Sequence, residues 1–386
     1  MKDAGNVFKS GTSRRTFLKS GTAAVGVATA AGMVIPGKLF AREDDGDGAR
    51  LTGGDIAILR LLSAAEQIEA DLWQQYSELG GTQDDEVSGI NGGNPIYTGA
   101  LELLDGDMAQ YVHDNTDDEI SHHAFLNNYL ASKGADPVDL SHFATLPSSK
   151  ATGARQVGRL TNLTQLTVDT TWWTRYRSTT NPDLGATFKN AVPSLAKGQF
   201  TAIPRTDDDL GGSFLSDDNS KSITDRLKAI AFTAGFHFAF IEQGGTSLYA
   251  TLAQQVTSLE VLRILLSIGG SEIMHFQTWQ DKAGNATPLT FTDPVNKSTA
   301  TFVDLTQNQP EELQSNLIMP EPVEFLHKSL GPVSIIRPTT RRNGGAVAAI
   351  QSFVDDGLFI GQKDQQFLRI VFGLAEEADE AHRRLD

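Results

Sequence analysis

The sequence contains no cysteine among its 386 residues. Disulfides, thiolate zinc sites, cysteine-ligated iron–sulfur clusters and cysteine nucleophiles are therefore excluded. Any metal that the chain holds has to be bound by Asp, Glu and His. The chain has 48 acidic residues and eight histidines for that purpose.

Basic residues are scarce, since 32 Lys and Arg stand against 48 Asp and Glu, for a formal net charge of −16. Six of these basic residues but only one acid lie within residues 1–41, so the rest of the chain is more acidic still. So acidic a surface repels phosphate backbones, and we expect no nucleic-acid partner. It also attracts cations, although simple solubility explains the same surplus.

The N-terminus matches an export signal. Arg14 and Arg15 within "SRRTFLKS" fit the twin-arginine consensus. The weakly hydrophobic stretch 21–35 is too short and too rich in Ala and Gly to span a bilayer permanently. We predict a signal peptide over residues 1–41, a flexible linker over residues 42–54, and a periplasmic or extracellular location. The twin-arginine translocase, the expected export partner, carries folded proteins, often with a cofactor already bound.

Helical periodicity dominates the remaining chain, and we predict an all-α fold. Residues 204–220 are expected to form a loop, and residues 287–340, rich in Pro and Thr, to be irregular with short strands. The predicted helices span residues 56–79, 97–132, 156–177, 222–255, 258–283, 346–355 and 364–384.

Four of these helices form two pairs that repeat. "QIEADLWQQY" in the first pair aligns with "FIEQGGTSLY" in the second, so that Glu69 corresponds to Glu242 and a Tyr follows each Glu seven residues later. The next helix of each pair carries Glu-x-x-His, at residues 119–122 and 272–275. This internal duplication predicts that the two helix pairs share one purpose.

The repeated Glu and His residues predict a dinuclear metal centre. Residues three apart lie on one helix face, and carboxylates gathered inside a bundle repel one another unless cations compensate them. Carboxylate and imidazole ligands together suit iron or manganese, and di-iron and di-manganese bundles use this pattern. We therefore predict two iron or manganese ions, held by Glu69, Glu119, His122, Glu242, Glu272 and His275.

Some assignments stay open. Glu66 competes with Glu69 as the ligand on the first helix; the repeat favours Glu69 because the second copy has Ala239 where Glu66 aligns, which leaves Glu66 as an extra ligand or a neighbour of the ligands. His123 is expected to point away from the site, since it follows His122 by one residue. The remaining expectations are ordinary structural histidines at His113 and His237, core packing for Tyr76 and Tyr249, and a solvated helix end at Asp379-x-x-His382.

With these motifs the chain resembles the ferritin-like superfamily, and among its members the exported ferritin-like proteins grouped with plant desiccation-related proteins. "AAEQIEADLW" is similar to their first helix and "DDEISHHAFLNNYL" to their second. The resemblance implies a ferritin-like four-helix bundle over residues 55–285. The bundle would be interrupted by an insert at residues 135–220 and followed by a C-terminal extension over residues 286–386.

The resemblance also implies a range of functions. The first is redox activity with dioxygen or peroxide, of the ferroxidase, oxidase or peroxidase type. The alternatives are simple iron binding and a non-catalytic structural role in stress or desiccation. Assembly into a homo-oligomer is left open as well.

Overall fold

The structure describes the chain from residue 51 onward, with gaps. It is a computed structural model of residues 51–84, 93–168, 192–211, 223–292, 299–302 and 345–384, with the short stretches 297, 321–322, 329 and 332–333. The predicted signal peptide, residues 1–41, lies outside the described residues, and so does most of the predicted linker.

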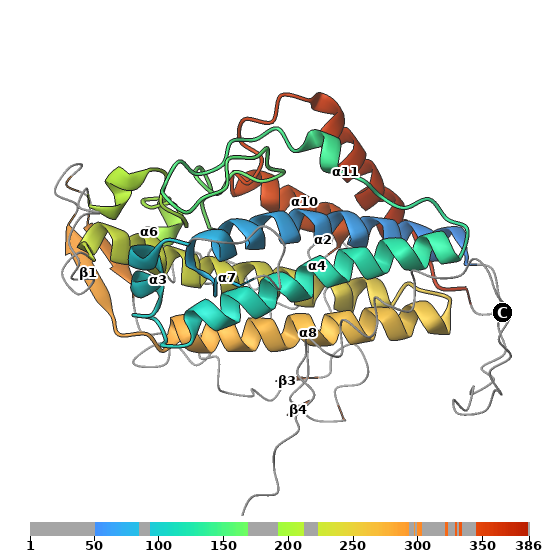
Figure 1. Cartoon of the computed structure of the whole chain (residues 1–386). Helices are drawn as coiled ribbons and strands as arrows, with labels where there is room; N and C mark the ends of the chain where they lie inside the picture. The colour runs from blue at the N-terminus through green and yellow to red at the C-terminus, as the bar shows by residue number, and fades with distance from the viewer. Residues whose placement is uncertain are drawn as a thin grey trace, which may run out of the picture. The chain divides into compact units, whose positions relative to one another are not determined.

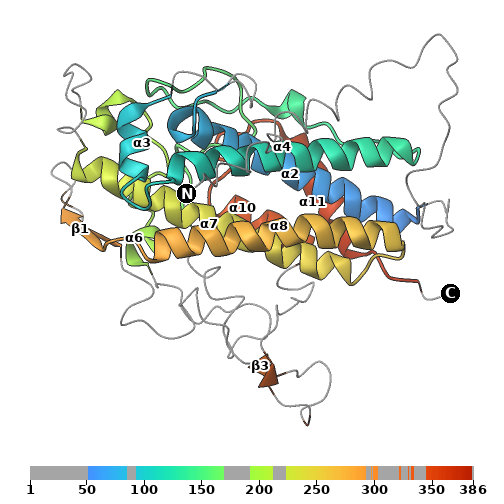
Figure 2. The same ribbon diagram turned by 60° about the horizontal axis from the view of Figure 1, so that its bottom comes forward.

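Four long helices form the body of the protein and lie side by side in Figures 1 and 2. They are α2 (Gly53–Gly80), α4 (Met108–Ser132), α7 (Asp225–Ala253) and α8 (Leu259–Gly284). Helix α2 packs along α4 and α7 along α8, as the repeat predicts. The all-α prediction is confirmed, because strands are few and short.

One predicted helix is broken in two. Residues 97–132 form α3 (Pro95–Leu101) and α4, with a turn between them. The turn holds Asp105, whose side chain accepts a hydrogen bond from the backbone N–H of Asp107 at 3.0 Å. Asp favours such local bonds over a continuing helix, and Gly106 beside it adds flexibility.

The first helix begins within the predicted linker. Thr52 caps α2 by accepting a hydrogen bond from the Asp55 N–H at 3.1 Å, and the Asp55 carboxylate completes a capping box. The same carboxylate accepts the Thr257 N–H at 2.8 Å, in the turn between α7 and α8. A single side chain therefore joins the start of one helix pair to the turn of the other.

The insert between α4 and α7 lies along a polar stripe of α2. Gln67 bonds both the carbonyl of Val138 and the N–H of Leu140, at 3.0 Å each, and Asp71 accepts the Thr161 N–H at 2.9 Å. Two turns further along, Glu78 forms an ion pair with Arg159, and both side chains are buried. Composition alone would predict that these polar residues face solvent. In the structure they form the surface to which the insert binds.

The helix predicted over residues 156–177 is absent from its described part. Residues 156–168 form no helix, and Arg159 instead pairs with Leu146 in an antiparallel bridge. The tertiary contacts of Thr161 and Arg159 with α2 compete with helix formation in this stretch despite its apolar periodicity. Residues 169–177 lie outside the described residues. The insert also contains the short helices η1 (Ser141–Phe143), α6 (Pro193–Ala196) and η3 (Asp207–Leu210).

Beyond the bundle, short strands and two helices follow. Strand β1 (Leu289–Thr292) pairs antiparallel with β2 (Thr299–Phe302), and β3 (Glu321–Pro322) with β4 (Pro332–Val333). Helix α10 (Ala346–Asp355) has the predicted bounds, and α11 (Gln365–Asp379) packs against α2 and α10.

The expectation of a solvated helix end at the C-terminus is wrong for Asp379. Its carboxylate accepts the N–H groups of Ala346 and Val347, at 2.8 and 3.0 Å, and so caps the start of α10. His382, three residues on, is exposed.

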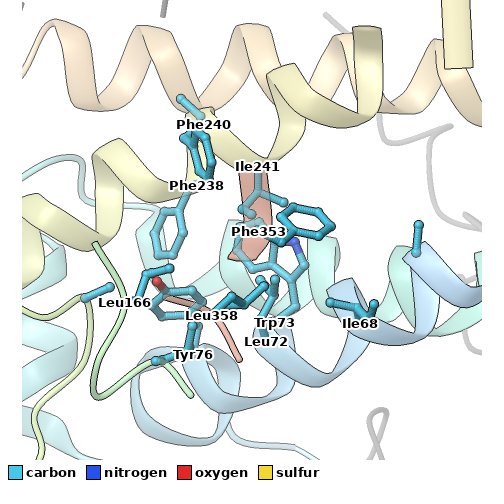
Figure 3. Packing of buried hydrophobic residues seen from close by; sticks show 14 of the residues in the cluster. Ile68, Leu72, Trp73, Tyr76, Leu166, Phe238, Phe240, Ile241, Phe353 and Leu358 are labelled. Carbon is cyan, nitrogen blue, oxygen red and sulfur yellow. The ribbon is translucent and has the colours of Figure 1, made fainter. Parts of the chain in front are cut away.

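The hydrophobic core joins the bundle to the C-terminal segment. Figure 3 shows Trp73 of α2 and Phe238 of α7 in one cluster with Phe353 and Leu358 of the C-terminal segment. Among the described residues, no helix has both the length and the apolar character needed to cross a membrane.

Candidate metal centre

Seven ionisable side chains gather inside the bundle, and six of them form two overlapping groups. The ligand atoms within each group lie within 4.8 Å of one another. Glu119 of α4 and Glu272 of α8 belong to both groups, so they stand between the two possible metal positions. The first group is Glu66, Glu119, His122 and Glu272, and the second is Glu119, Glu242, Glu272 and His275.

Each histidine points one ring nitrogen at the carboxylates. His122 Nδ1 lies 3.1 Å from Glu119, 3.4 Å from Glu66 and 3.5 Å from Glu272. His275 Nδ1 lies 3.2 Å from Glu242 and 3.4 Å from Glu119. The centroids of the two imidazole rings are 6.5 Å apart. The spacing of Glu-x-x-His is responsible, because it places both side chains of each motif on the inner face.

The other ring nitrogen of each histidine is held from outside the cluster. Asp118 Oδ2 lies 3.1 Å from His275 Nε2, and Ser271 Oγ lies 3.3 Å from His122 Nε2. Such partners orient an imidazole and leave its other nitrogen for a metal. Neither residue is predicted from the sequence. They share one sequence feature, because each directly precedes the Glu of a Glu-x-x-His motif. Each contacts the histidine of the other motif.

Glu69, the predicted ligand of the first helix, belongs to neither group. Glu66, one helical turn earlier, takes that place opposite Glu242. Glu69 is buried beside a small apolar cavity lined in part by Phe240 and Ile350. The repeat aligns Glu69 with Glu242 through the shared "IE", whereas the outer glutamates of the two groups are Glu66 and Glu242. Metal binding by Glu69 stays a prediction.

The position that corresponds to Glu69 in the second pair is then Gly245. A Cβ atom there would lie 2.4 Å from Glu272 Oε2, closer than real Cβ atoms approach. The absence of a side chain at Gly245 therefore makes room for Glu272, one of the two carboxylates common to both groups.

Two further side chains bind the cluster. The Tyr249 hydroxyl donates a short hydrogen bond to Glu66, so the expectation of simple core packing is wrong for this tyrosine. Asn115 donates from Nδ2 to Glu119 and to Glu242, at 2.9 Å each, and its Oδ1 accepts the indole N–H of Trp279 at 2.7 Å. Every polar atom of the Asn115 side chain is thus assigned a partner.

The remaining histidines are not part of the cluster. His237 is fully buried, its Nδ1 is 2.5 Å from the Tyr76 hydroxyl, and burial lowers its pKa to about 3. His123 is half-buried, and burial with the nearby His122 lowers its pKa. His113 is buried near Asp84, with 3.8 Å between them. Tyr76 packs in the core as expected, and also makes the bond to His237.

The buried carboxylates of the cluster outnumber its imidazoles, and this shifts the pKa values of both. Burial and the neighbouring carboxylates raise the pKa of Glu272 and of Glu69 well above the usual range, and burial also raises that of Glu242. Burial acts to lower the pKa of His122, but Glu66 and Glu119 outweigh it and raise the pKa to about 11. Without added cations, the cluster therefore has to hold extra protons.

The donor set fits a pair of divalent cations. Within the described part of the chain, neither carboxylate oxygen of Glu272 has a hydrogen-bond donor, although both are buried. The same holds for Oε2 of Glu66. Buried carboxylate oxygens are normally satisfied, so these three mark positions where a ligand is expected. Four carboxylates and two imidazoles are a donor set suited to iron or manganese.

Comparison with known proteins identifies the family. The family of proteins described as "Ferritin-like domain" matches residues 54–285, which is more than half of the chain. The chain therefore belongs to the ferritin-like domain family. No curated protein and no solved structure matches it.

Replacing Gly245 by Ala is expected to weaken metal binding at both positions, because the new methyl group displaces the Glu272 carboxylate. Gly270→Ala is the matched control, since a Cβ there meets nothing within 4 Å and lies on the same helix as Glu272. Metal content after dialysis against a weak chelator measures the effect. Equal retention by the two variants would show that Glu272 does not depend on the space at Gly245.

The metal-free protein is expected to lose stability as the pH rises. Glu242 and Glu272, with raised pKa values, hold protons in the folded state that the unfolded chain has released above about pH 4.5. The contribution of His122 is complete below its usual pKa of 6.5 and is lost as the pH passes about 11. Bound metal replaces these protons, so urea unfolding from about pH 5 to about pH 10 should show a smaller slope for the metal-loaded protein. Surface charges common to both forms cancel in this comparison, and equal slopes would contradict the assignment.

Proposed function

We propose that this ferritin-like protein is an exported dinuclear iron or manganese protein with redox activity toward dioxygen or peroxide. The observation that carries the proposal is the pair of overlapping ligand groups with Glu119 and Glu272 in common. A mononuclear site needs only one such group. Two groups that share two carboxylates are the arrangement expected for two ions held close together.

The ligands are proposed residue by residue. Glu66 and His122 would hold one ion, Glu242 and His275 the other, and Glu119 and Glu272 both. A pair of such ions, when bound, supplies one-electron changes at two neighbouring metals, which suits the two-electron reduction of peroxide.

The protein's own residues would set the conditions for this chemistry. Asp118 and Ser271 orient the two imidazoles through their outer nitrogens. Tyr249 and Asn115 donate hydrogen bonds to Glu66 and Glu242, and so limit the directions in which these carboxylates can turn. The surrounding core excludes bulk water, which strengthens every electrostatic interaction at the site.

Metal content is the first test of the proposal. The full chain, produced in a host with a twin-arginine pathway and supplied with iron and manganese, is expected to carry about two metal ions per chain by elemental analysis. A Glu119→Gln/Glu272→Gln variant should lose both. Glu66→Gln should lose metal while Glu69→Gln, a matched change three residues away, keeps it.

Turnover then separates the remaining functions. Consumption of hydrogen peroxide or dioxygen by the metal-loaded protein, and not by the double variant, supports the redox function. If the protein binds two ions but turns over neither oxidant, metal binding is its only supported function. A native protein that is folded but free of metal would reject the proposal in favour of a structural role.

Export is proposed from Arg14 and Arg15 within "SRRTFLKS", followed by a short apolar stretch. Replacing both arginines by Lys keeps the charge but removes the pair that this pathway recognises. The variant is expected to accumulate in the cytoplasm, whereas the unchanged chain is recovered outside it, as fractionation and immunoblotting would show. Equal export of the two chains would refute the assignment of this pathway.

A further inference from the structure

A chain of aromatic contacts leads from the ligand groups to the surface. Trp279 of α8 is buried, and its indole N–H donates to Asn115, which in turn donates to the ligands Glu119 and Glu242. The amide orientation of Asn115 follows from its partners, because the indole needs an acceptor and the two carboxylates need donors. Trp279 is thus one hydrogen-bonded side chain away from two ligands.

The outer end of this chain is Tyr111. Its ring meets the ring of Trp279 edge to face, with centroids 6.1 Å apart and planes at 76°. Unlike Trp279, Tyr111 is 38% exposed. Lys282 lies 4.2 Å from the centre of the Tyr111 ring and is held by Asp105 at 2.8 Å. A cation on one side and Trp279 on the other fix the orientation of an exposed phenol.

Burial explains the inner half of this arrangement but not the outer half. Trp279 also stacks on Trp73, with centroids 5.5 Å apart, and core packing accounts for that contact. Core packing does not account for an exposed tyrosine in ring contact with a tryptophan whose only polar group faces a partner of the ligands. In a protein without cysteine, indole and phenol are the side chains that most readily give up a single electron.

We propose that Tyr111 and Trp279 form a path along which single electrons pass from a small reductant at the surface to the metal ligands. This inference rests on the redox function proposed above and adds the class of reductant, a small phenol able to donate a hydrogen atom. Asn115 and Trp279 connect the path to Glu119 and Glu242, and Tyr111 is where the reductant meets the protein.

The steps balance with peroxide as the oxidant. Trp279 passes one electron inward through Asn115, Tyr111 replaces it and releases its phenolic proton to water, and the reductant returns a hydrogen atom to Tyr111. Two such rounds deliver two electrons. Together with the two protons released to water, they convert one hydrogen peroxide to two waters and leave two molecules of reductant each oxidised by one electron.

The experiment uses the metal-loaded full chain, hydrogen peroxide as oxidant and guaiacol as the phenol. Tyr111→Phe removes the surface end of the path without disturbing the core. Tyr129→Phe is the matched control, because Tyr129 is also a partly exposed tyrosine of α4 but contacts Phe125 and Lys133 instead of a tryptophan. Trp279→Phe interrupts the path at its centre, and metal analysis with thermal unfolding checks that each variant is loaded and folded.

Two readouts are expected to agree. Without guaiacol, freeze-quenched samples should show a tyrosyl radical by electron paramagnetic resonance, and peptide mass spectrometry should find oxidation at Tyr111 and Trp279. Tyr111→Phe should lose guaiacol oxidation and leave the radical on tryptophan. Trp279→Phe should lose both the radical and the oxidation of Tyr111. Tyr129→Phe should match the unchanged protein.

The outcomes separate this inference from the function on which it rests. If the unchanged protein consumes peroxide but Tyr111→Phe oxidises guaiacol equally well, or Trp279→Phe still forms the radical at Tyr111, the path is rejected and the redox function stands. If the unchanged protein binds no metal or leaves peroxide untouched, both fail together.

Discussion

The burial of five carboxylates and two imidazoles in one bundle core is the constraint on which the rest of the structure depends. Uncompensated carboxylates at such close range repel one another, and burial raises this cost because little solvent screens them. The chain offsets this repulsion in two ways. It supplies donors such as Tyr249 and Asn115 to some oxygens. It leaves others, including both oxygens of Glu272, free of any hydrogen-bond donor in the described structure, where a cation would satisfy them.

The two helix pairs are alike in their ligands but differ in what surrounds them. Each pair contributes one Glu and one Glu-x-x-His, and the residue before each motif Glu holds the histidine of the other pair. The partners of the two outer carboxylates differ, since Glu66 accepts from a phenol and Glu242 from an amide. Two ions at these positions would therefore differ in environment. Asn115, which accepts from Trp279, bonds the shared Glu119 and, of the two outer carboxylates, Glu242 rather than Glu66.

The segments outside the bundle close one side of it. The insert binds the polar stripe of α2: Val138 of the insert accepts from Gln67 of the stripe, and Arg159 of the insert pairs with Glu78. Helix α11 packs against the same helix. On the side of α4 and α8, the described structure leaves His122 and His275 partly accessible, with 11% and 14% of their side chains exposed.

The sequence by itself determined the helical class, the two repeated pairs and five of the six side chains that form the two groups, because a helix converts a spacing of three residues into a common face without help from the rest of the chain. Tertiary structure decided that Glu66 joins the two groups while Glu69 does not, since this depends on how far one helix slides along another, which periodicity does not encode. It also decided that residues 156–168 form no helix, and that Asp118, Asn115 and Tyr249 serve the site. Contacts between segments far apart in the chain are set by packing, and packing is visible only once all the segments are in place.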